Sequence, residues 1–278
     1  MPLELITLPC LTDNYAYLVR NTETNEVALI DAPEAGPIVS CLDAHGLTLS
    51  TILLTHHHWD HVDGVPDLVA RYNPKIIGAA ADEARLPRLD QSVVDGQTIT
   101  ICGEPCEVID VYGHTIGHVA FYFPLSGYLF SADSLMAFGC GRLFEGTPAQ
   151  MWDSMQRLRA LPDDTLVCSG HEYTASNAKF VATIDPNTPA VQARIQSTTE
   201  ARAKNEATVP SLLSLEKATN PYLRADHPDL KAALGMEGAT DLDVFTFHAE
   251  RIISDSLVQK HSALTRRYRA MTRNVKRI

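Results

Sequence analysis

Residues 56–61 have the sequence His-His-His-Trp-Asp-His and directly follow an apolar segment, residues 51–54. Packing alone accounts poorly for such a cluster, because protonated histidines repel one another. A bound cation is the usual compensation, since it keeps the imidazoles neutral and uses their lone pairs. Alternate side chains of an extended segment share a face, so His56 and His58 can bind one ion. His57 then points elsewhere and is expected to be a hydrogen-bonded structural residue.

One loop cannot complete the coordination of two ions, so further ligands must come from the ends of later strands. Three segments each place a His or an Asp beside small residues, directly after a predicted strand. These candidates are His114 after residues 107–111, Asp133 after residues 128–131, and His171 after residues 166–168. Taken alone, a strand-end aspartate is more typical of a helix cap. Together with residues 56–61, the three candidates favour a metal centre.

The elements that must position these residues fall into two groups along the chain. Short apolar segments separated by turn residues predict strands in the first 170 residues. The predicted strands are residues 3–8, 15–19, 27–30, 51–54, 76–78, 98–101, 107–111, 119–123, 128–131 and 166–168. Helices are predicted at residues 37–45, 65–72 and 148–161, then at 175–183, 190–204 and about 241–261. No strand pattern follows residue 173, and strands followed by helices predict two domains.

Composition limits the class of protein. The chain has 278 residues, of which 45% are hydrophobic, and a net charge of −11, which argues against general nucleic-acid binding. No apolar segment reaches the roughly 20 residues of a transmembrane helix, and the N-terminus has no secretory signal pattern. The six cysteines are scattered in apolar surroundings and are expected to be reduced thiols of a cytoplasmic protein.

A wider set of motifs gives the chain a specific resemblance. They are residues 8–15 (LPCLTDNY), 55–63 (THHHWDHVD), 114–118 (HTIGH), 138–147 (FGCGRLFEGT), 170–174 (GHEYT), 208–211 (TVPS) and 220–224 (NPYLR). The H-x-H-x-D-H pattern followed by spaced His, Asp and His resembles the metallo-β-lactamase superfamily. Across residues 1–225 the chain resembles the glyoxalase II, or hydroxyacylglutathione hydrolase, family. This implies an α+β fold, with a four-layer αββα catalytic sandwich over residues 1–173 and an all-helical substrate-binding domain over residues 174–278.

The resemblance also assigns metal ligands. It implies one ion bound by His56, His58 and His114, a second bound by Asp60, His61 and His171, and Asp133 as the bridge between them. Two divalent ions are therefore expected, zinc first, with iron or manganese as alternatives that tolerate the same ligand types. His118 lies four residues after His114, but the family pattern uses the first of the two, so His118 is expected to support the site.

The activity implied by the resemblance is hydrolysis of S-(2-hydroxyacyl)glutathione, typically S-D-lactoylglutathione, to a 2-hydroxy acid and glutathione, as in methylglyoxal degradation. Two ions that share a water lower its pKa, and the resulting hydroxide attacks the thioester carbonyl. Asp60 and Asp133 are the expected catalytic residues, with Asp60 orienting the proton of the hydroxide. Arg142 and Tyr173 occupy positions where the family contacts glutathione, and Phe144 stands where some members have Tyr.

One departure concerns the grip on the glycine carboxylate of glutathione. Members of the family usually have an Arg and a Lys three residues apart on a late helix, and Ala249 and Ile252 occupy those positions here. Either Arg251 or the basic segment 266–278 substitutes for them, or glutathione is held more weakly, or the thiol carrier differs. That segment has six basic residues and no acid, a composition also typical of a solvated helix end.

Alternative functions come from the same superfamily. A persulfide dioxygenase needs a single iron bound by two His and one Asp, so the second complete ligand set weighs against it. Another thioesterase of the superfamily, or a non-catalytic metal sensor, is a further alternative, although sensors usually lose ligands. The expected partner is a small glutathione thioester, with no nucleic acid and no membrane, and the chain is expected to be a monomer.

Overall fold

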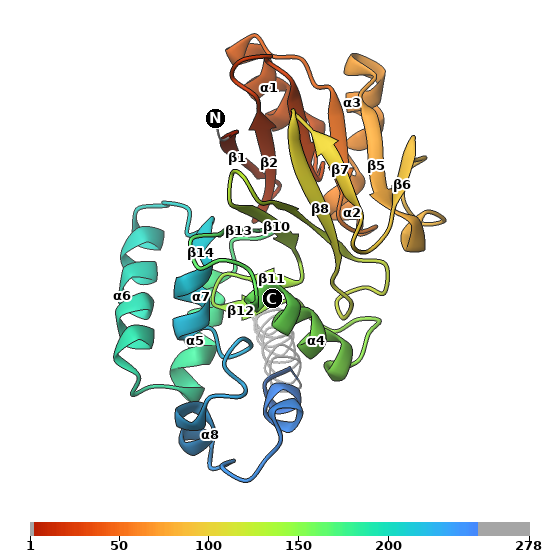
Figure 1. The fold of residues 1–278 in the computed structure, drawn as a ribbon. Coiled ribbons are helices and arrows are strands. Elements are labelled where there is room, and N and C mark those ends of the chain that lie inside the picture. The colour runs from red at the N-terminus through yellow and green to blue at the C-terminus, as the bar shows by residue number, and fades with distance from the viewer. Residues whose placement is uncertain (1–2, 250–278) are drawn as a thin grey trace, which may run out of the picture.

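The computed structural model describes residues 3–249, which form two six-stranded mixed β-sheets with helices around them (Figure 1). The first sheet has the spatial order β1 (Glu4–Cys10), β2 (Asn14–Arg20), β3 (Val27–Ile30), β4 (Thr51–Leu54), β5 (Lys75–Ala79) and β6 (Gln91–Val93). Strands β3 to β6 run parallel to one another. Every residue of β3 and β4 is buried, which explains their uninterrupted apolar sequence.

The second sheet contains the later strands. Its spatial order is β14 (Ser211–Leu212), β13 (Leu166–Ser169), β10 (Tyr128–Ala132), β9 (Val119–Phe123), β8 (Glu104–Asp110) and β7 (Thr98–Ile101). A small separate sheet pairs β11 (Leu135–Met136) with β12 (Gly139–Cys140). The parallel pairing of β10 with β13 shifts register between Phe130 and Ala132. This irregularity lies immediately before Asp133, at the end of β10.

The main apolar core lies between the two sheets. Tyr17 and Leu53 project into it from the first sheet, and Phe121, Phe123 and Phe130 project from the second. The Phe130 ring lies 5.6 Å from the ring centroids of both Tyr17 and Phe123. Each buried side chain of this size stabilises the fold by about 1.5–3 kcal/mol through apolar burial. The sheets are therefore fixed face to face, and the ends of their strands are held in register.

Helices cover the outer face of each sheet. Ile38 and Leu68 pack on the outside of the first sheet, whereas Met151 and Leu158 pack on the outside of the second. The helices that carry them are α1 (Ala35–His45), α3 (Val65–Tyr72) and α4 (Pro148–Arg159). The order helix, sheet, sheet, helix confirms the expected four-layer αββα sandwich. Helix α4 begins as predicted, because Thr147 caps it and forms a reciprocal capping box with Gln150.

The remaining helices gather below the sheets, at the lower left of Figure 1. They are α5 (Thr174–Ile184), α6 (Pro189–Ala203), α7 (Leu213–Thr219) and α8 (Pro228–Leu234), and residues 241–249 are also helical. Ala178 and Val181 of α5 pack with Val191 of α6 against Phe138. The helical part of the chain thus rests on the loop that follows Asp133.

Several short elements escape the sequence pattern. The prediction that no strand follows residue 173 is wrong, because β14 pairs with β13 through Ser211 and Val167. Strands β6, β11 and β12 and helices α7, α8 and α2 (Trp59–Val62) were likewise not predicted. The missed helices have four to seven residues, too few to establish a helical period, and none of the missed strands contains more than two consecutive apolar residues.

Two sequence expectations concern the chain as a whole. Among residues 3–249, no helix combines the length and the apolar character needed to cross a bilayer. All six cysteines are free, and five of them are buried. This arrangement agrees with the expectation of reduced core thiols, and Cys102 and Cys106 form no disulfide.

Candidate metal centre

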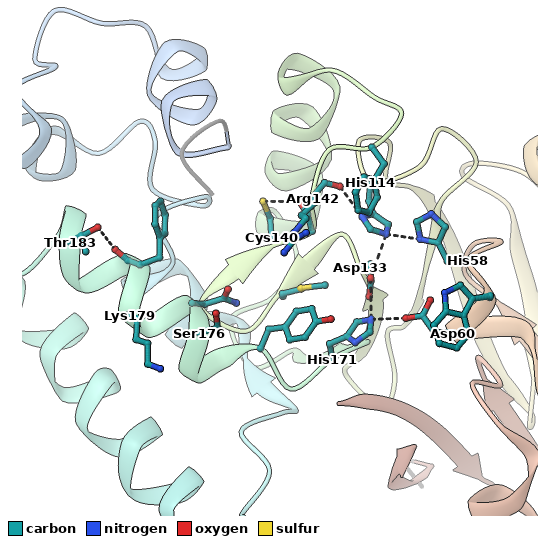
Figure 2. Close-up of a pocket in the computed structure, with 17 residues that line it drawn as sticks. His58, Asp60, His114, Asp133, Cys140, Arg142, His171, Ser176, Lys179 and Thr183 are labelled. Atoms are coloured by element: carbon teal, nitrogen blue, oxygen red, sulfur yellow. Dashed lines mark hydrogen bonds and ion pairs between the residues drawn. The ribbon is translucent and has the colours of Figure 1, made fainter. Parts of the chain in front are cut away.

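Segments far apart in the sequence bring the candidate ligands to one edge of the sandwich (Figure 2). Residues 55–58 form the loop between β4 and α2, and His114 lies in the loop between β8 and β9. Asp133 directly follows β10, and His171 follows β13. The backbone N–H of Tyr15 donates to the carbonyl of Gly170 at 2.8 Å, which joins the two sheets beside the site.

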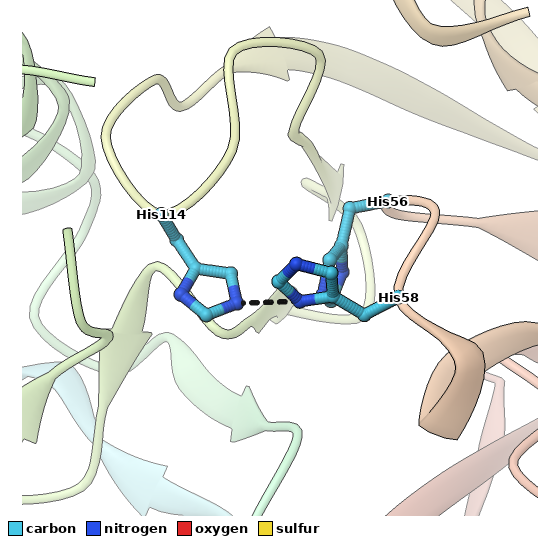
Figure 3. A group of neighbouring side chains, drawn as sticks. All are labelled: His56, His58 and His114. Carbon is cyan, nitrogen blue, oxygen red and sulfur yellow. Dashed lines mark hydrogen bonds between the residues drawn. The ribbon is translucent and has the colours of Figure 1, made fainter. Parts of the chain in front are cut away.

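The first cluster consists of His56, His58 and His114 (Figure 3). Nδ1 of His58 lies 3.1 Å from Nε2 of His56 and 3.0 Å from Nε2 of His114. Two nitrogens that each lie about 2.0–2.1 Å from a tetrahedral ion are roughly 3.3–3.4 Å apart. The three imidazoles are therefore spaced closely enough to share one ion. His56 and His58 face the same way, as their alternation in an extended segment predicts.

The second cluster consists of Asp60, His61 and His171. Oδ2 of Asp60 lies 3.5 Å from Nε2 of His171. The chain turns from extended to helical at Trp59, where α2 begins. This change of backbone conformation brings Asp60 toward His171 and places the His61 ring between the two clusters, 4.2 Å from the ring of His56 and 5.4 Å from that of His171.

Asp133 lies between the two clusters. Its Oδ2 atom is 3.4 Å from Nε2 of His114 in the first cluster and 3.2 Å from Nε2 of His171 in the second. Its Oδ1 atom is 3.5 Å from Nε2 of His61. The carboxylate is buried, so its position is suited to bridging two ions.

The polar atoms at the centre of the site fit bound cations. Nε2 of His61 and Oδ1 of Asp133 are buried and have no hydrogen-bond partner among the described residues. Buried polar atoms without partners are costly, so native structures satisfy nearly all of them. Divalent ions between imidazole and carboxylate donors would satisfy both atoms, and the donor types are those that such ions accept.

The electrostatics of the site also favour cations. Burial lowers the pKa of His56 well below its usual value and that of His58 to about 4, so both rings offer neutral lone pairs. Burial would raise the pKa of Asp133, but His171 and His61 outweigh it and hold that pKa well below its usual range. The pKa of His171 is raised to about 9, because Asp133 outweighs the effect of burial. A cation bound there therefore displaces a proton.

Groups behind the clusters orient the imidazole rings. Nδ1 of His61 lies 2.8 Å from Oδ2 of Asp31, and Nδ1 of His171 lies 3.0 Å from Oδ1 of Asp13. Such outer contacts fix the ring orientation and tautomer of a ligand histidine. Asp31 also lies near His56, but it accepts hydrogen bonds from the N–H and hydroxyl of Thr55, which identifies it as an orienting residue.

Asp31 and Asp13 were not among the sequence candidates. Asp31 directly follows the buried strand β3, so the rule that identified Asp133 would also have found it. Asp13 lies in the turn between β1 and β2 and is 158 residues from His171 in the sequence. The sequence around Asp13 indicates only a turn between two strands.

Two further histidines have supporting roles, as expected. Nδ1 of His57 lies 2.9 Å from Oδ2 of Asp82, outside both clusters. The His118 ring stacks on His56 at 4.6 Å with an interplanar angle of 10°. Its Nδ1 atom lies 3.1 Å from the carbonyl oxygen of Val119. Both contacts hold rings or loops near the first cluster.

Glycines permit the close approach of the site segments. A Cβ atom at Gly170 would lie 2.5 Å from Oδ1 of Asp133 and 2.8 Å from Cε1 of His61. A Cβ atom at Gly141 would lie 1.7 Å from the carbonyl oxygen of Asp133. No side chain fits at either position without displacing Asp133.

The clusters open into a pocket of about 740 Å³ that extends to α5. It is lined by His58, Trp59, Asp60, His114, Asp133, Met136, Cys140, Gly141, Arg142, Phe144, His171, Tyr173, Ser176, Asn177, Lys179, Phe180 and Thr183. The Tyr173 ring stacks on His171 at 4.6 Å. Arg142 is exposed, and its carbonyl oxygen lies 2.8 Å from Nδ1 of His114. The two expected substrate-binding residues therefore flank the metal clusters.

The two positions on the late helix where the family usually has an Arg and a Lys are Ala249 and Ile252 in this chain. Ala249 is buried in the apolar cluster that includes Phe245 and does not line the pocket. Ile252, Arg251 and the basic segment 266–278 lie outside the described residues. Within residues 3–249, the cationic side chains on the pocket wall are those of Arg142 and, on α5, Lys179.

The layered fold and the paired His/Asp clusters define a metallo-β-lactamase superfamily protein with a divalent-metal centre. The model of that superfamily matches residues 11–171, and the model described as the hydroxyacylglutathione hydrolase C-terminus matches residues 172–249. The chain belongs to the hydroxyacylglutathione hydrolase family, because its similarity to curated members is high and nearly complete, and this confirms the family expected from the motifs.

Two relatives illustrate the similarity. The hydroxyacylglutathione hydrolase of Ruegeria pomeroyi is 58% identical over 88% of this chain and 96% of its own. That of a Jannaschia species is 58% identical over 87% of this chain and 95% of its own. Among solved structures, TTHA1623 in a di-iron-bound form is 27% identical and has a TM-score of 0.58, covering 79% of this chain and 100% of its own.

Proposed function

We propose that this protein hydrolyses the thioester bond of S-(2-hydroxyacyl)glutathione, typically S-D-lactoylglutathione, and releases a 2-hydroxy acid and glutathione. The main observation behind this proposal is the arrangement of the site. Two clusters of possible metal ligands, joined through Asp133, lie beside a pocket of about 740 Å³ that is lined by the cationic side chain of Arg142. The name shared by the relatives supports the same reaction. The reaction places the protein in the degradation of methylglyoxal.

Two divalent ions would be bound by the residues of the two clusters. We assign the first ion to His56, His58 and His114, the second to Asp60, His61 and His171, and the bridging position to Asp133. When bound, the ions supply an activated water near neutral pH and stabilise the negative charge that forms on the thioester oxygen. The departing thiolate needs no general acid, because a thiol of pKa about 8.5 leaves readily as an anion.

We assign to Asp60 the orientation of the attacking water. Its carboxylate lines the pocket and accepts a hydrogen bond from Nδ2 of Asn14 at 3.2 Å. The same Nδ2 atom also donates to the backbone carbonyl of Asp60 at 2.9 Å. Asn14 thus fixes both the backbone and the side chain of Asp60. The Asp60 carboxylate can then accept the proton of a water at the centre of the site.

Asp60→Asn is expected to lower kcat by about 10²-fold, with a much smaller change in KM, because an amide cannot accept that proton. Steady-state kinetics with S-D-lactoylglutathione on samples of equal metal content would measure both constants. The exposed Asp163→Asn serves as the control. An effect confined to KM would contradict the assigned role.

For the metals we propose zinc, with iron as the main alternative. The two clusters offer imidazole and carboxylate donors without a thiolate, and such donors suit either ion. Cys140 also lines the pocket, but burial raises the pKa of its thiol, which keeps it protonated. TTHA1623 was solved with two irons. Metal analysis of the purified protein would identify the ions.

We further propose that residues 1–173 form the catalytic domain and residues 174–278 a helical substrate-binding domain. Helix α5 supports this division, because it supplies one wall of the pocket. The free cysteines support a reducing cytoplasmic location. We propose a monomer, since one chain supplies both clusters.

Glutathione would be held along the wall formed by α5. Tyr173 begins this wall beside the metal clusters, and Ser176, Lys179 and Thr183 follow on the pocket side of the helix. Among residues 3–249, Lys179 has no ion-pair partner, and its side chain is exposed. We propose that Lys179 and Arg142 take over the recognition of glutathione carboxylates from the missing late-helix cations.

Lys179→Met is expected to raise KM for S-D-lactoylglutathione about fivefold, the size of one partly exposed ion pair, with kcat little changed. The same substitution should leave KM unchanged for S-D-lactoyl-N-acetylcysteamine, whose carrier has no carboxylate. Lys204→Met is a matched control, because Lys204 is also exposed but lies outside the pocket. Equal effects on both substrates would contradict a charge-recognition role.

The loss of thioester absorbance with S-D-lactoylglutathione tests the main proposal. The protein is measured as purified, after chelation, and after divalent metal is restored. We expect hydrolysis that chelation removes and metal restores. A fully metallated protein that leaves the thioester intact would overturn the proposal. Oxygen consumption with glutathione persulfide would then indicate a dioxygenase instead.

A further inference from the structure

His57 lies in the middle of the metal-binding motif but belongs to a different set of contacts. Its Nδ1 atom is 2.9 Å from Oδ2 of Asp82, and its Nε2 atom is 3.8 Å from Oε1 of Glu145. The Asp82 side chain is completely buried. A buried carboxylate needs compensating partners. His57 is one of the two ion-pair partners of Asp82 among the described residues.

Arg85 supplies the second partner and completes an ion-pair network. Its Nε atom donates to Oδ1 of Asp82 at 2.5 Å, and its Nη1 and Nη2 atoms donate to Glu145 at 2.5 and 3.2 Å. Oε2 of Glu145 also accepts a hydrogen bond from the backbone N–H of Ile116 at 2.9 Å. Arg85 thus joins a carboxylate beside the motif loop to a carboxylate on a different loop.

The network connects the three loops around the first cluster. His57 belongs to the loop of His56 and His58, and Ile116 belongs to the loop of His114. The Glu145 loop includes Phe144, whose ring lies 5.8 Å from His58 and 5.2 Å from His114. Its neighbour Arg142 places its carbonyl oxygen 2.8 Å from Nδ1 of His114.

The chain packs closely around this network. A Cβ atom at Gly117 would lie 2.6 Å from Cβ of Asp82, so the loop of His114 rests directly on the buried carboxylate. The second cluster is oriented by other groups, because Asp31 contacts His61 and Asp13 contacts His171. Among the described residues, neither aspartate forms a hydrogen bond or ion pair with Asp82 or Arg85.

We propose that Arg85 is a positioning residue that sets the affinity of the first metal site, through the network of His57, Asp82 and Glu145. The inference rests on the proposed assignment of one ion to each cluster. Without Arg85, the carboxylates of Asp82 and Glu145 no longer share the guanidinium group. The hydrogen bonds and ion pairs through which Arg85 connects the three loops are then lost. The imidazoles of the first cluster then lose their mutual spacing, while the second cluster keeps its own orienting groups.

Arg85→Met tests the proposal through metal binding. Orienting contacts around metal ligands contribute about 10- to 100-fold to metal affinity. We therefore expect the variant to retain one ion per chain at a chelator concentration at which the unchanged protein retains two. Arg157→Met is the matched control, because Arg157 has the same exposed side-chain fraction, 36%, and also pairs with an aspartate, but lies outside the network. It should retain two ions.

Two backgrounds identify the affected site. His171→Ala removes a ligand of the second cluster, and His114→Ala removes one of the first. Adding Arg85→Met should weaken the remaining ion by about 10-fold or more in the His171→Ala background. In the His114→Ala background it should change affinity by less than about twofold. Equal weakening in both backgrounds, or two ions retained by Arg85→Met, would overturn the proposal.

Metal counting separates this inference from the proposed function. An unchanged protein that binds two ions but does not hydrolyse the thioester would refute the function and leave the role of Arg85 intact. Urea unfolding of the metal-free proteins completes the test. We expect the metal-free Arg85→Met protein to remain folded but to be less stable than Arg157→Met, because Asp82 is completely buried and keeps only His57 as an ion-pair partner among the described residues, whereas Asp95, the partner of Arg157, is exposed. A metal-free Arg85→Met protein that is unfolded would show a general structural role instead.

Discussion

Replacing Asp133 with alanine is expected to lower kcat by about 10³-fold, the upper range for losing one preorganised electrostatic group. The reason is its place between the clusters, with one oxygen 3.4 Å from His114 and 3.2 Å from His171. Alanine leaves both ions with an incomplete ligand set, so metal content should also fall below two per chain. Steady-state kinetics and elemental analysis of the same sample would measure the two effects.

Asp163→Ala is the control for this substitution. Asp163 is also a carboxylate beside the second sheet, but its side chain is 73% exposed and pairs with Lys217 at the surface. We expect normal turnover and two ions per chain in this variant. If Asp133→Ala kept two ions and near-normal turnover, the bridging assignment would be wrong.

Replacing Glu216 with leucine is expected to lower the free energy of unfolding by about 3–5 kcal/mol. The substitution leaves the buried guanidinium of Arg194 without its carboxylate partner, and this is the usual cost of an unpaired buried charge. The Glu216 side chain is completely buried and forms a bidentate ion pair with Arg194. Its carboxylate also accepts hydrogen bonds from Ser211 at 2.5 Å and from Nδ2 of Asn220 at 3.0 Å. Urea unfolding of the metal-free protein would give the difference.

The Glu216 contacts extend to the metal loop. Its Oε2 atom accepts a hydrogen bond from the backbone N–H of Phe138 at 2.9 Å, within the loop that follows Asp133. Asn220 donates to the carbonyl oxygens of Met136 and Gly139 in the same loop. The destabilised variant should therefore also bind metal less tightly.

Asp226→Ala provides the comparison for Glu216. Asp226 also forms a bidentate pair with an arginine, Arg159, but the two side chains are 33% and 26% exposed. Exposed pairs contribute about 1 kcal/mol or less. Similar losses in the two variants would contradict the view that burial, and not pairing itself, makes Glu216 important.

The features that depend only on neighbouring residues could be predicted from the amino-acid sequence. The alternation of His56 and His58, the buried strand before them, and the cap of α4 at Thr147 are all local. Each follows from backbone geometry over a few residues. The family motifs are equally local, so they identified the superfamily and the family without any long-range contact.

The support that distant residues give to the site depends on the folding of the two sheets and could not be predicted from the sequence. The contacts of His171 with Asp13 and of His57 with Asp82 join residues 158 and 25 positions apart, and no local pattern specifies such pairs. The same holds for Lys179. In the sequence it cannot be distinguished from any other lysine on the exposed face of a helix, and only the fold places it on the pocket wall. Local geometry therefore indicated which groups could bind metal, whereas the packing of the two sheets and α5 determined which groups orient them and which side chains line the pocket.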